Sequence, residues 1–128
     1  MATFVKDPAG WKEFTASPRS PIYRDVNSRG RRLEFLAKNQ VGVRTTRLRE
    51  SMTSRTTVDA RGIVNTTGSN NKIALLHHQG SKPHPIYPKR AKTLRFVQNG
   101  RVRYAQRVYH PGTKPNKYLT DNLRKVVL

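Results

Sequence analysis

The sequence contains no cysteine and few acidic residues, and both absences limit its chemistry. Seven Asp and Glu stand against 26 Lys and Arg, which gives a formal net charge of +19. No acidic residue lies between Asp59 and Asp121. Without cysteine there is no disulfide framework and no thiolate metal site. We therefore expect a protein made for a cytoplasm, or for an assembly built in one, with polyanions or acidic protein faces as partners.

Apolar residues are also scarce, which limits the core. Hydrophobic residues make up 34% of the chain, and no run reaches the roughly 18 apolar residues of a membrane span. Met1-Ala2-Thr3 does not open a signal peptide. We expect a single domain over residues 1–128, with a short helix in an N-terminal arm over 1–19 and an α+β domain over 20–128. We expect its loops or arms to gain order from partners.

Groups suited to catalysis or metal binding are few. Acid–base catalysis by paired carboxylates needs two acids in one pocket, and the second half of the chain offers only Asp121. Neither a nucleophile elbow nor a Gly-rich phosphate loop is present. His77, His78 and His84 could cluster around a metal, but adjacent histidines point in different directions and their surroundings are cationic. We expect no catalysis, no metal and no cofactor.

Two helices are predicted in the first third of the chain. Asp7-Pro8 is a cap followed by a first helical residue, for a helix reaching about Ala16. Ser20-Pro21 repeats that signal for a helix of about twenty residues ended by Gly42. Apolar residues recur through it at three-to-four-residue spacing, which is typical of one buried stripe: Ile22, Val26, Leu33, Leu36, Ala37 and Val41.

The next segments predict antiparallel strands. After a basic link over residues 44–49, β-branched residues are enriched in Ser51–Val58 and Gly62–Thr67, which predicts two strands joined around residues 59–61. Residues 67–71 are predicted as a loop. Ile73–Leu76 favours a short helix stopped at Gly80, and a closing helix is predicted to begin near Pro115.

A hairpin is predicted to turn at Asn99-Gly100. A two-residue turn would place Leu94 and Phe96 on the opposite face from Val102 and Tyr104, whereas a three-residue loop would place all four on one face. We predict the three-residue loop, because it separates an apolar core face from an arginine face. The candidate contacts with a partner or with DNA are Lys89, Arg90, Arg95, Arg101, Arg103 and Arg107.

One short pattern occurs twice, thirty-two residues apart, as His78-Gln79-Gly80-Ser81-Lys82-Pro83-His84 and as His110-Pro111-Gly112-Thr113-Lys114-Pro115-Asn116. In each copy glycine permits a positive φ, and the Lys before Pro favours extended backbone. Each copy therefore predicts a sharp turn followed by a stiff segment. The candidate structural turns and docking loops are His78, Gly80, Pro83, His110, Pro111, Gly112 and Pro115.

Further motifs follow the first copy in a fixed order: Ile86-x-Pro88, Ala91-Lys-x-Leu94-x-Phe96, Gly100, then the second copy and Leu119. With both copies, this order resembles the neck, or head–tail joining, proteins of long-tailed bacteriophages. The similarity is to the branch common in actinobacterial phages, often labelled minor tail or head-to-tail connector protein. It covers roughly residues 20–127. Val43–Met52 is similar to the family's Thr-Gly-x-Leu-Arg-x-Ser segment, with Thr46 where glycine is usual, and Lys117-Tyr118 replaces the family's Pro-Phe.

The resemblance implies an α+β fold: a long N-terminal helix packed on an antiparallel sheet with β-hairpins, and a short C-terminal helix. It also implies a structural, non-enzymatic ring subunit of the virion neck, assembled in the host cytoplasm, between the portal-side connector and the tail. The implied partners are further copies of the chain, a head-completion or stopper protein, and a tail-terminator or tail-tube protein. Non-specific contact with channel DNA is also expected, and a membrane is not.

Two alternatives stay open. One is a tail terminator ring protein of the same connector. The other is a small basic nucleic-acid-binding module, in which the run Lys89–Lys92 would meet phosphates and Tyr87, Tyr104 and Tyr109 would stack on bases.

Overall fold

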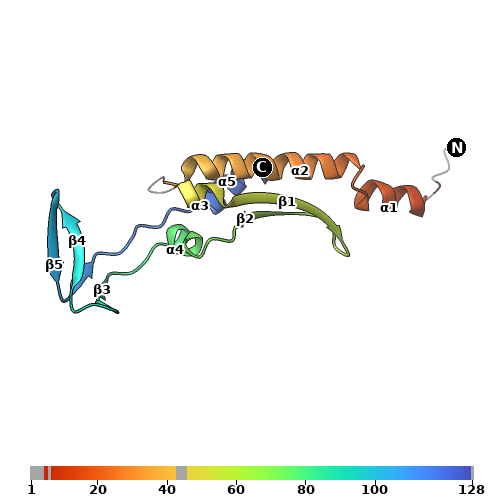
Figure 1. Cartoon of the computed structure of the whole chain (residues 1–128). Coiled ribbons are helices and arrows are strands. Elements are labelled where there is room, and N and C mark those ends of the chain that lie inside the picture. The colour runs from red at the N-terminus through yellow and green to blue at the C-terminus, as the bar shows by residue number, and fades with distance from the viewer. Residues whose placement is uncertain (1–4, 6, 43–45, 128) are drawn as a thin grey trace. The chain divides into compact units, whose positions relative to one another are not determined.

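The computed structural model describes residue 5, residues 7–42 and residues 46–127, which form two compact units (Figure 1). Unit 1 comprises the described residues up to Ala74 and from Lys117 onward, and unit 2 is Leu75–Asn116. The helices are α1 Pro8–Ala16, α2 Pro21–Gln40, α3 Thr46–Glu50, α4 Ile73–Gln79 and α5 Tyr118–Val127. The strands are β1 Met52–Asp59, β2 Gly62–Ser69, β3 His84–Ile86, β4 Leu94–Gln98, β5 Arg101–Ala105 and β6 Val108–His110.

The predicted α+β class is confirmed: a long N-terminal helical region, antiparallel hairpins and a short C-terminal helix are all present. The single-domain expectation stays a prediction.

The first two helices begin at the predicted caps. The Asp7 carboxylate accepts hydrogen bonds from two backbone N–H groups of the first turn of α1. The Ser20 hydroxyl accepts one from the N–H of Tyr23 at 3.0 Å. These contacts satisfy N–H groups that a helix start leaves unpaired. α2 spans twenty residues, as predicted, and ends at Gln40 with Val41 as an extended cap residue, which places Gly42 directly after the cap.

The predicted basic link contains a short helix. Residues 43–45 lie outside the described residues, but α3 occupies Thr46–Glu50 and buries Leu48. Leu48 and Met52 belong to one core cluster, so this segment contributes an apolar side chain as well as charge. Tertiary packing accounts for the helix, since five residues are too few to be helical on their own.

The β1–β2 hairpin forms one side of unit 1, and α2 lies along it (Figure 1). The two strands pair in a continuous register from Met52 with Ser69 to Asp59 with Gly62. β1 has the predicted length but begins and ends one residue later, whereas β2 is two residues longer and includes residues 67–69, which were predicted as a loop. Side chains alternate between the two faces of a strand, so Met52, Ser54 and Thr56 share one face, and all three are more buried than the residues between them.

The contact between α2 and this hairpin is polar at its centre. The Asn65 side-chain amide donates to Ser54 Oγ and to Thr56 Oγ1, both at 2.9 Å. Thr67 Oγ1 donates to Asn65 Oδ1 at 2.8 Å. Gly30 of α2 is buried against this amide, and a Cβ at Gly30 would overlap it. The glycine that weakens α2 in the sequence therefore lets the helix approach the sheet.

The apolar core lies at one end of α2, where α3, β1, α4 and α5 contribute residues. The buried cluster consists of Ala37, Val41, Leu48, Met52, Ala74 and Tyr118, with Leu119 packed against it. The Tyr118 hydroxyl donates to the carbonyl of Ala74 at 3.1 Å. This hydrogen bond satisfies the one polar group that Tyr118 brings into the core.

Candidate functional site

Unit 2 is built from short paired strands and contains all four histidines of the chain. β3 pairs with β6, and β4 pairs with β5, both antiparallel. Every residue of Leu75–Asn116 is described, and none of them is buried. This unit is therefore held by backbone pairing rather than by a hydrophobic core of its own.

The two copies of the repeated motif cross and pair with each other. Ser81 N donates to Thr113 O at 3.0 Å, and Thr113 N donates back to Ser81 O at 3.1 Å. These residues occupy the same place in their respective copies. The pairing continues on one side into His84 opposite His110, and on the other side Asn116 N donates to His77 O at 3.1 Å.

The glycines of the two copies have equivalent environments at this crossing. Gly80 has a φ of +76° and Gly112 a φ of +89°, so both glycines have the positive φ that the motif predicts. A Cβ at Gly80 would overlap the carbonyl of Thr113, and one at Gly112 would overlap the carbonyl of Ser81. Gly80 also lies against Pro115, and Gly112 lies against Pro83, so each glycine meets the proline of the other copy. The two copies are thus related by a local twofold axis, which makes the repeat a structural device. We refer to this pairing as the crossing.

The crossing also brings together two histidines that sequence reasoning kept apart. The rings of His84 and His110 are stacked with centroids 5.2 Å apart. His84 Nδ1 lies 2.9 Å from the carbonyl of Lys82, which can only accept, so Nδ1 is the donor in this contact. His110 Nδ1 accepts from the N–H of Gly112 at 3.0 Å. Among the described residues no group of three or more potential metal ligands is found, so the suggested grouping of His77, His78 and His84 is not formed.

The predicted register of the β4–β5 hairpin was wrong. The turn is a two-residue turn in which both Asn99 and Gly100 have positive φ, 52° and 73°. Such a turn twists in the same sense as the strands, and asparagine tolerates this conformation better than most residues. Gln98 pairs with Arg101, and Val97 pairs with Val102. The local turn chemistry decided the register over the separation of apolar from charged residues.

The two-residue turn divides the arginines between both faces. Arg95 lies directly opposite Tyr104, on the same face as the Val97–Val102 pair. Arg101 and Arg103 lie on the other face, with Leu94, Phe96 and Ala105. The single arginine face predicted for Arg95, Arg101, Arg103 and Arg107 is therefore not formed. Tyr104 was predicted to lie in the core, but 66% of it is exposed.

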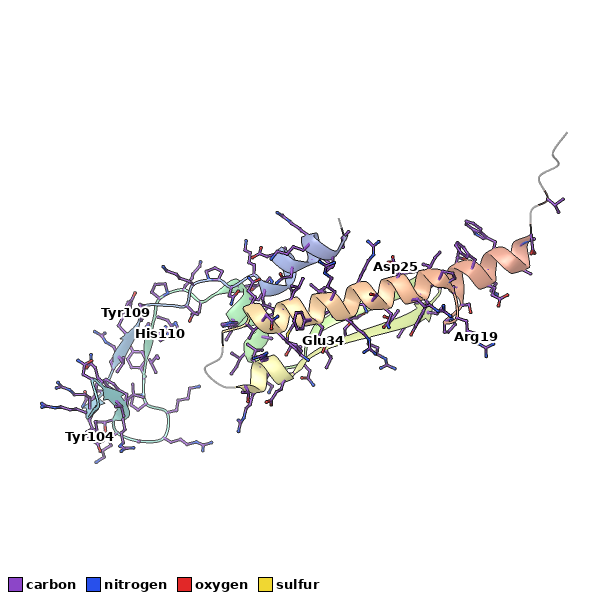
Figure 2. The ribbon with its side chains drawn as sticks, turned by 90° about the horizontal axis from the view of Figure 1, so that it is seen from above. Arg19, Asp25, Glu34, Tyr104, Tyr109 and His110 are labelled. Atoms are coloured by element: carbon purple, nitrogen blue, oxygen red, sulfur yellow. The ribbon has the colours of Figure 1, made fainter. Side chains whose placement is uncertain are left out.

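The positive charge of unit 2 has no compensation within the unit. Residues 75–116 contain four Lys and five Arg and no Asp or Glu. The ion pairs among the described residues all lie in unit 1, between Asp25 and Arg29, Glu34 and Lys38, and Asp59 and Arg61. Figure 2 labels Asp25 and Glu34 on α2, Tyr104 on the hairpin, and Tyr109 and His110 on β6. All six candidate contact residues are exposed and make no ion pair within the described chain: Lys89, Arg90, Arg95, Arg101, Arg103 and Arg107.

Unit 2 thus combines unbalanced positive charge with exposed apolar and aromatic side chains on short paired strands. No protein-family model, curated protein or solved structure matches the chain. None of the described helices is long and apolar enough to cross a membrane.

Proposed function

We propose that this chain is a non-enzymatic structural subunit of the head–tail connector of a long-tailed bacteriophage. In this proposal it forms a neck or tail-completion ring between the portal-side connector and the tail, and unit 2 docks on a neighbouring component. The ordered motifs of residues 78–119 motivate the assignment to this family. The α+β architecture agrees with the fold that the resemblance implies.

The observation that carries the proposal is the contrast between the two units. Unit 1 buries an apolar cluster that includes Met52 and Tyr118. Unit 2 has no buried residue in 42 positions, yet it exposes large apolar side chains such as Leu75, Val97 and Tyr109. Exposed apolar surface that the chain cannot cover itself marks an interaction site. A subunit completed by its neighbours has this organisation, and a closed ring repeats one contact at every step.

The crossing gives unit 2 a rigidity that suits docking. Two reciprocal hydrogen bonds join Ser81 and Thr113, and three further residue pairs join β3 and β6. Pro83, Pro85 and Pro88 restrict the backbone between the crossing and the hairpin. A segment that is ordered before binding loses less conformational entropy on association. We infer that the twin motifs act as corners that present the β4–β5 hairpin.

Co-expression with the proteins encoded beside it tests the proposal. The full chain is expected to form a ring-sized oligomer, or to co-purify with a portal-proximal or tail-tube protein, as measured by light scattering after size-exclusion chromatography. Association with the portal-proximal side favours a neck ring, and association with the tail-tube end favours a tail terminator. A chain that stays monomeric and binds neither component would refute the proposal.

A matched pair of variants ties assembly to the crossing. Gly80→Val together with Gly112→Val places side chains against the opposing carbonyls and is expected to abolish association. Gly68→Ala is the control, because nothing lies within 4 Å of a Cβ at that glycine. Helix content measured by circular dichroism should be largely preserved in both variants, since α1, α2, α3 and α5 contribute no residue to the crossing.

A further inference from the structure

We propose that one face of the β4–β5 hairpin docks on an acidic protein surface whose centre is apolar. This face consists of Arg95, Val97, Val102 and Tyr104, and we call it the valine–tyrosine face. The proposal rests on the proposed function, because it names the kind of partner that unit 2 meets in the assembly.

The pairing of the hairpin defines this face. Val97 lies directly opposite Val102, and Arg95 lies directly opposite Tyr104. The exposed fractions are 67% for Val97, 43% for Val102 and 66% for Tyr104. On the other face, Leu94 and Phe96 are half-buried. The valine–tyrosine face is therefore the side of the ribbon whose apolar groups are left to solvent.

The composition of the face favours a protein over a nucleic acid. Protein interfaces concentrate tyrosine and arginine around an apolar centre from which water is excluded. The directly opposed Val97 and Val102 supply such a centre, and Tyr104 and Arg95 flank it. A nucleic acid gains little from contact with two valines, since its phosphates are bound by cations and its bases stack on aromatic rings.

The charge of unit 2 indicates which residues should surround the apolar centre of the partner's surface. Its nine Lys and Arg face no acidic residue in the unit, and none of them forms an ion pair within the described chain. Complementary potential accelerates encounter and suppresses wrong partners. A partner surface with carboxylates around an apolar groove can bury the two valines and form ion pairs with the surrounding cations.

Charge also argues against a second copy of this chain as the occupant. All seven acidic residues lie in unit 1, which itself carries 17 of the 26 Lys and Arg. Three of the acids, Asp25, Glu34 and Asp59, are already paired with cations of unit 1. Unit 1 is therefore basic as well, and the valine–tyrosine face of one copy meets net positive charge on another.

The test begins with peptides displayed on phage and selected on the immobilised full chain at about 150 mM salt, where weak surface attraction is screened. We expect the selected peptides to combine Asp or Glu with apolar residues. One selected peptide is then labelled and titrated with the chain by fluorescence anisotropy. Val97→Thr with Val102→Thr keeps the shape and β-propensity of both side chains, and it should weaken binding at least about tenfold. Val127→Thr is the control, because Val127 is 59% exposed in unit 1, and it should leave the affinity unchanged.

A duplex of about 20 base pairs and a poly-glutamate peptide serve as charge-only probes, and their affinity should not respond to the threonine variants. Three results would overturn the proposal. The first is that the selected peptides lack acidic residues. The second is that the Val97→Thr/Val102→Thr variant binds the duplex more weakly than the wild type does. The third is that the wild-type chain self-associates in sedimentation and that this variant does not. If connector components associate but the threonine pair binds the selected peptide like the wild type, the docking face fails and the proposed function stands. If the peptide results hold and no connector component associates, the proposed function fails instead.

Discussion

Replacing Gly30 with alanine is expected to destabilise unit 1, although the same substitution at an exposed position in a helix stabilises that helix. Alanine is favoured over glycine in a helix interior by about 1 kcal/mol. Gly30 is buried, however, and a Cβ there would overlap the side-chain amide of Asn65. The amide has little room to move, because it donates to Ser54 and Thr56 and accepts from Thr67.

The magnitude follows from the hydrogen bonds that would be displaced. A typical intramolecular hydrogen bond contributes about 0.5–1.5 kcal/mol net, so moving the amide away from three partners costs roughly 1.5–4.5 kcal/mol. Subtracting the helix-propensity gain of about 1 kcal/mol leaves a net loss of roughly 0.5–3.5 kcal/mol in the free energy of unfolding.

Urea denaturation followed by circular dichroism at a helix wavelength measures this loss. The control is the same glycine change made in an Asn65→Ala background, where the overlapping amide is gone. There the Gly30→Ala substitution should become neutral or stabilising by up to about 1 kcal/mol, which reverses its sign. A wild-type background in which Gly30→Ala raises the denaturation midpoint would refute the close approach of α2 to β2.

Three further predictions concern single residues. Gly112→Ala should remove hydrogen-exchange protection from the Ser81 amide, because the added Cβ overlaps the Ser81 carbonyl at a φ of +89°; unchanged protection would contradict the crossing. Burial raises the pKa of Tyr118 above 10.0, so the stability that its neutral hydroxyl contributes should be fully present below pH 10.0 and be lost as the pH rises through the raised pKa of the folded state. Tyr118→Phe should abolish this alkaline loss of stability in urea titrations. At neutral pH the same substitution should cost about 1 kcal/mol, because it removes the hydrogen bond to Ala74. Hydrogen bonds from Arg61 hold the pKa of Asp59 below 3.8, so Arg61→Gln should raise the pKa of Asp59 in an NMR titration. In the wild type, the stability from this pair should be present above the ordinary pKa of an aspartate. It should be lost as the pH falls through the lowered pKa of Asp59.

The helices were predictable because their signals are local. In Asp7-Pro8 and in Ser20-Pro21, a capping side-chain oxygen is followed directly by a proline whose φ suits a helix. In the structure both pairs begin a helix, with the first residue as N-cap and the proline as first helical residue. The apolar spacing of α2 likewise reports which side is buried, since Leu33 and Ala37 are one turn apart and both lie inward. What the spacing could not report was that Asn65, far along the chain, takes up the space that Gly30 leaves.

The hairpin was mispredicted because two rules conflicted. Keeping Val102 and Tyr104 with Phe96 on one apolar face required a three-residue loop, whereas Asn99-Gly100 favours a two-residue turn. A longer loop would be favoured only if one face of this hairpin packed on a core. Unit 2 has no fully buried residue, so little burial energy was available to oppose the turn, and the turn chemistry prevailed.

The pairing of the twin motifs could not be derived from either copy alone. Each copy predicts a positive φ at its own glycine, and both glycines have one. That Ser81 meets Thr113 is a contact between residues far apart in the sequence, and periodicity carries no information about such pairs. The repeat itself was the available signal, since two copies of one extended, turn-flanked segment can pair about a twofold axis.

The local twofold axis of the crossing has a consequence for assembly. Because the two copies play equivalent parts, a copy in one chain offers another chain the same backbone donors and acceptors that it offers its own partner. Within a chain the two copies are linked, which gives them an effective concentration in the millimolar range for a short connection. Exchange between chains is therefore negligible in dilute solution and becomes competitive where subunits are crowded to a similar local concentration. In the proposed ring, packing of the subunits would supply that crowding, and strand exchange between neighbouring subunits would then be a low-cost variant of the same fold.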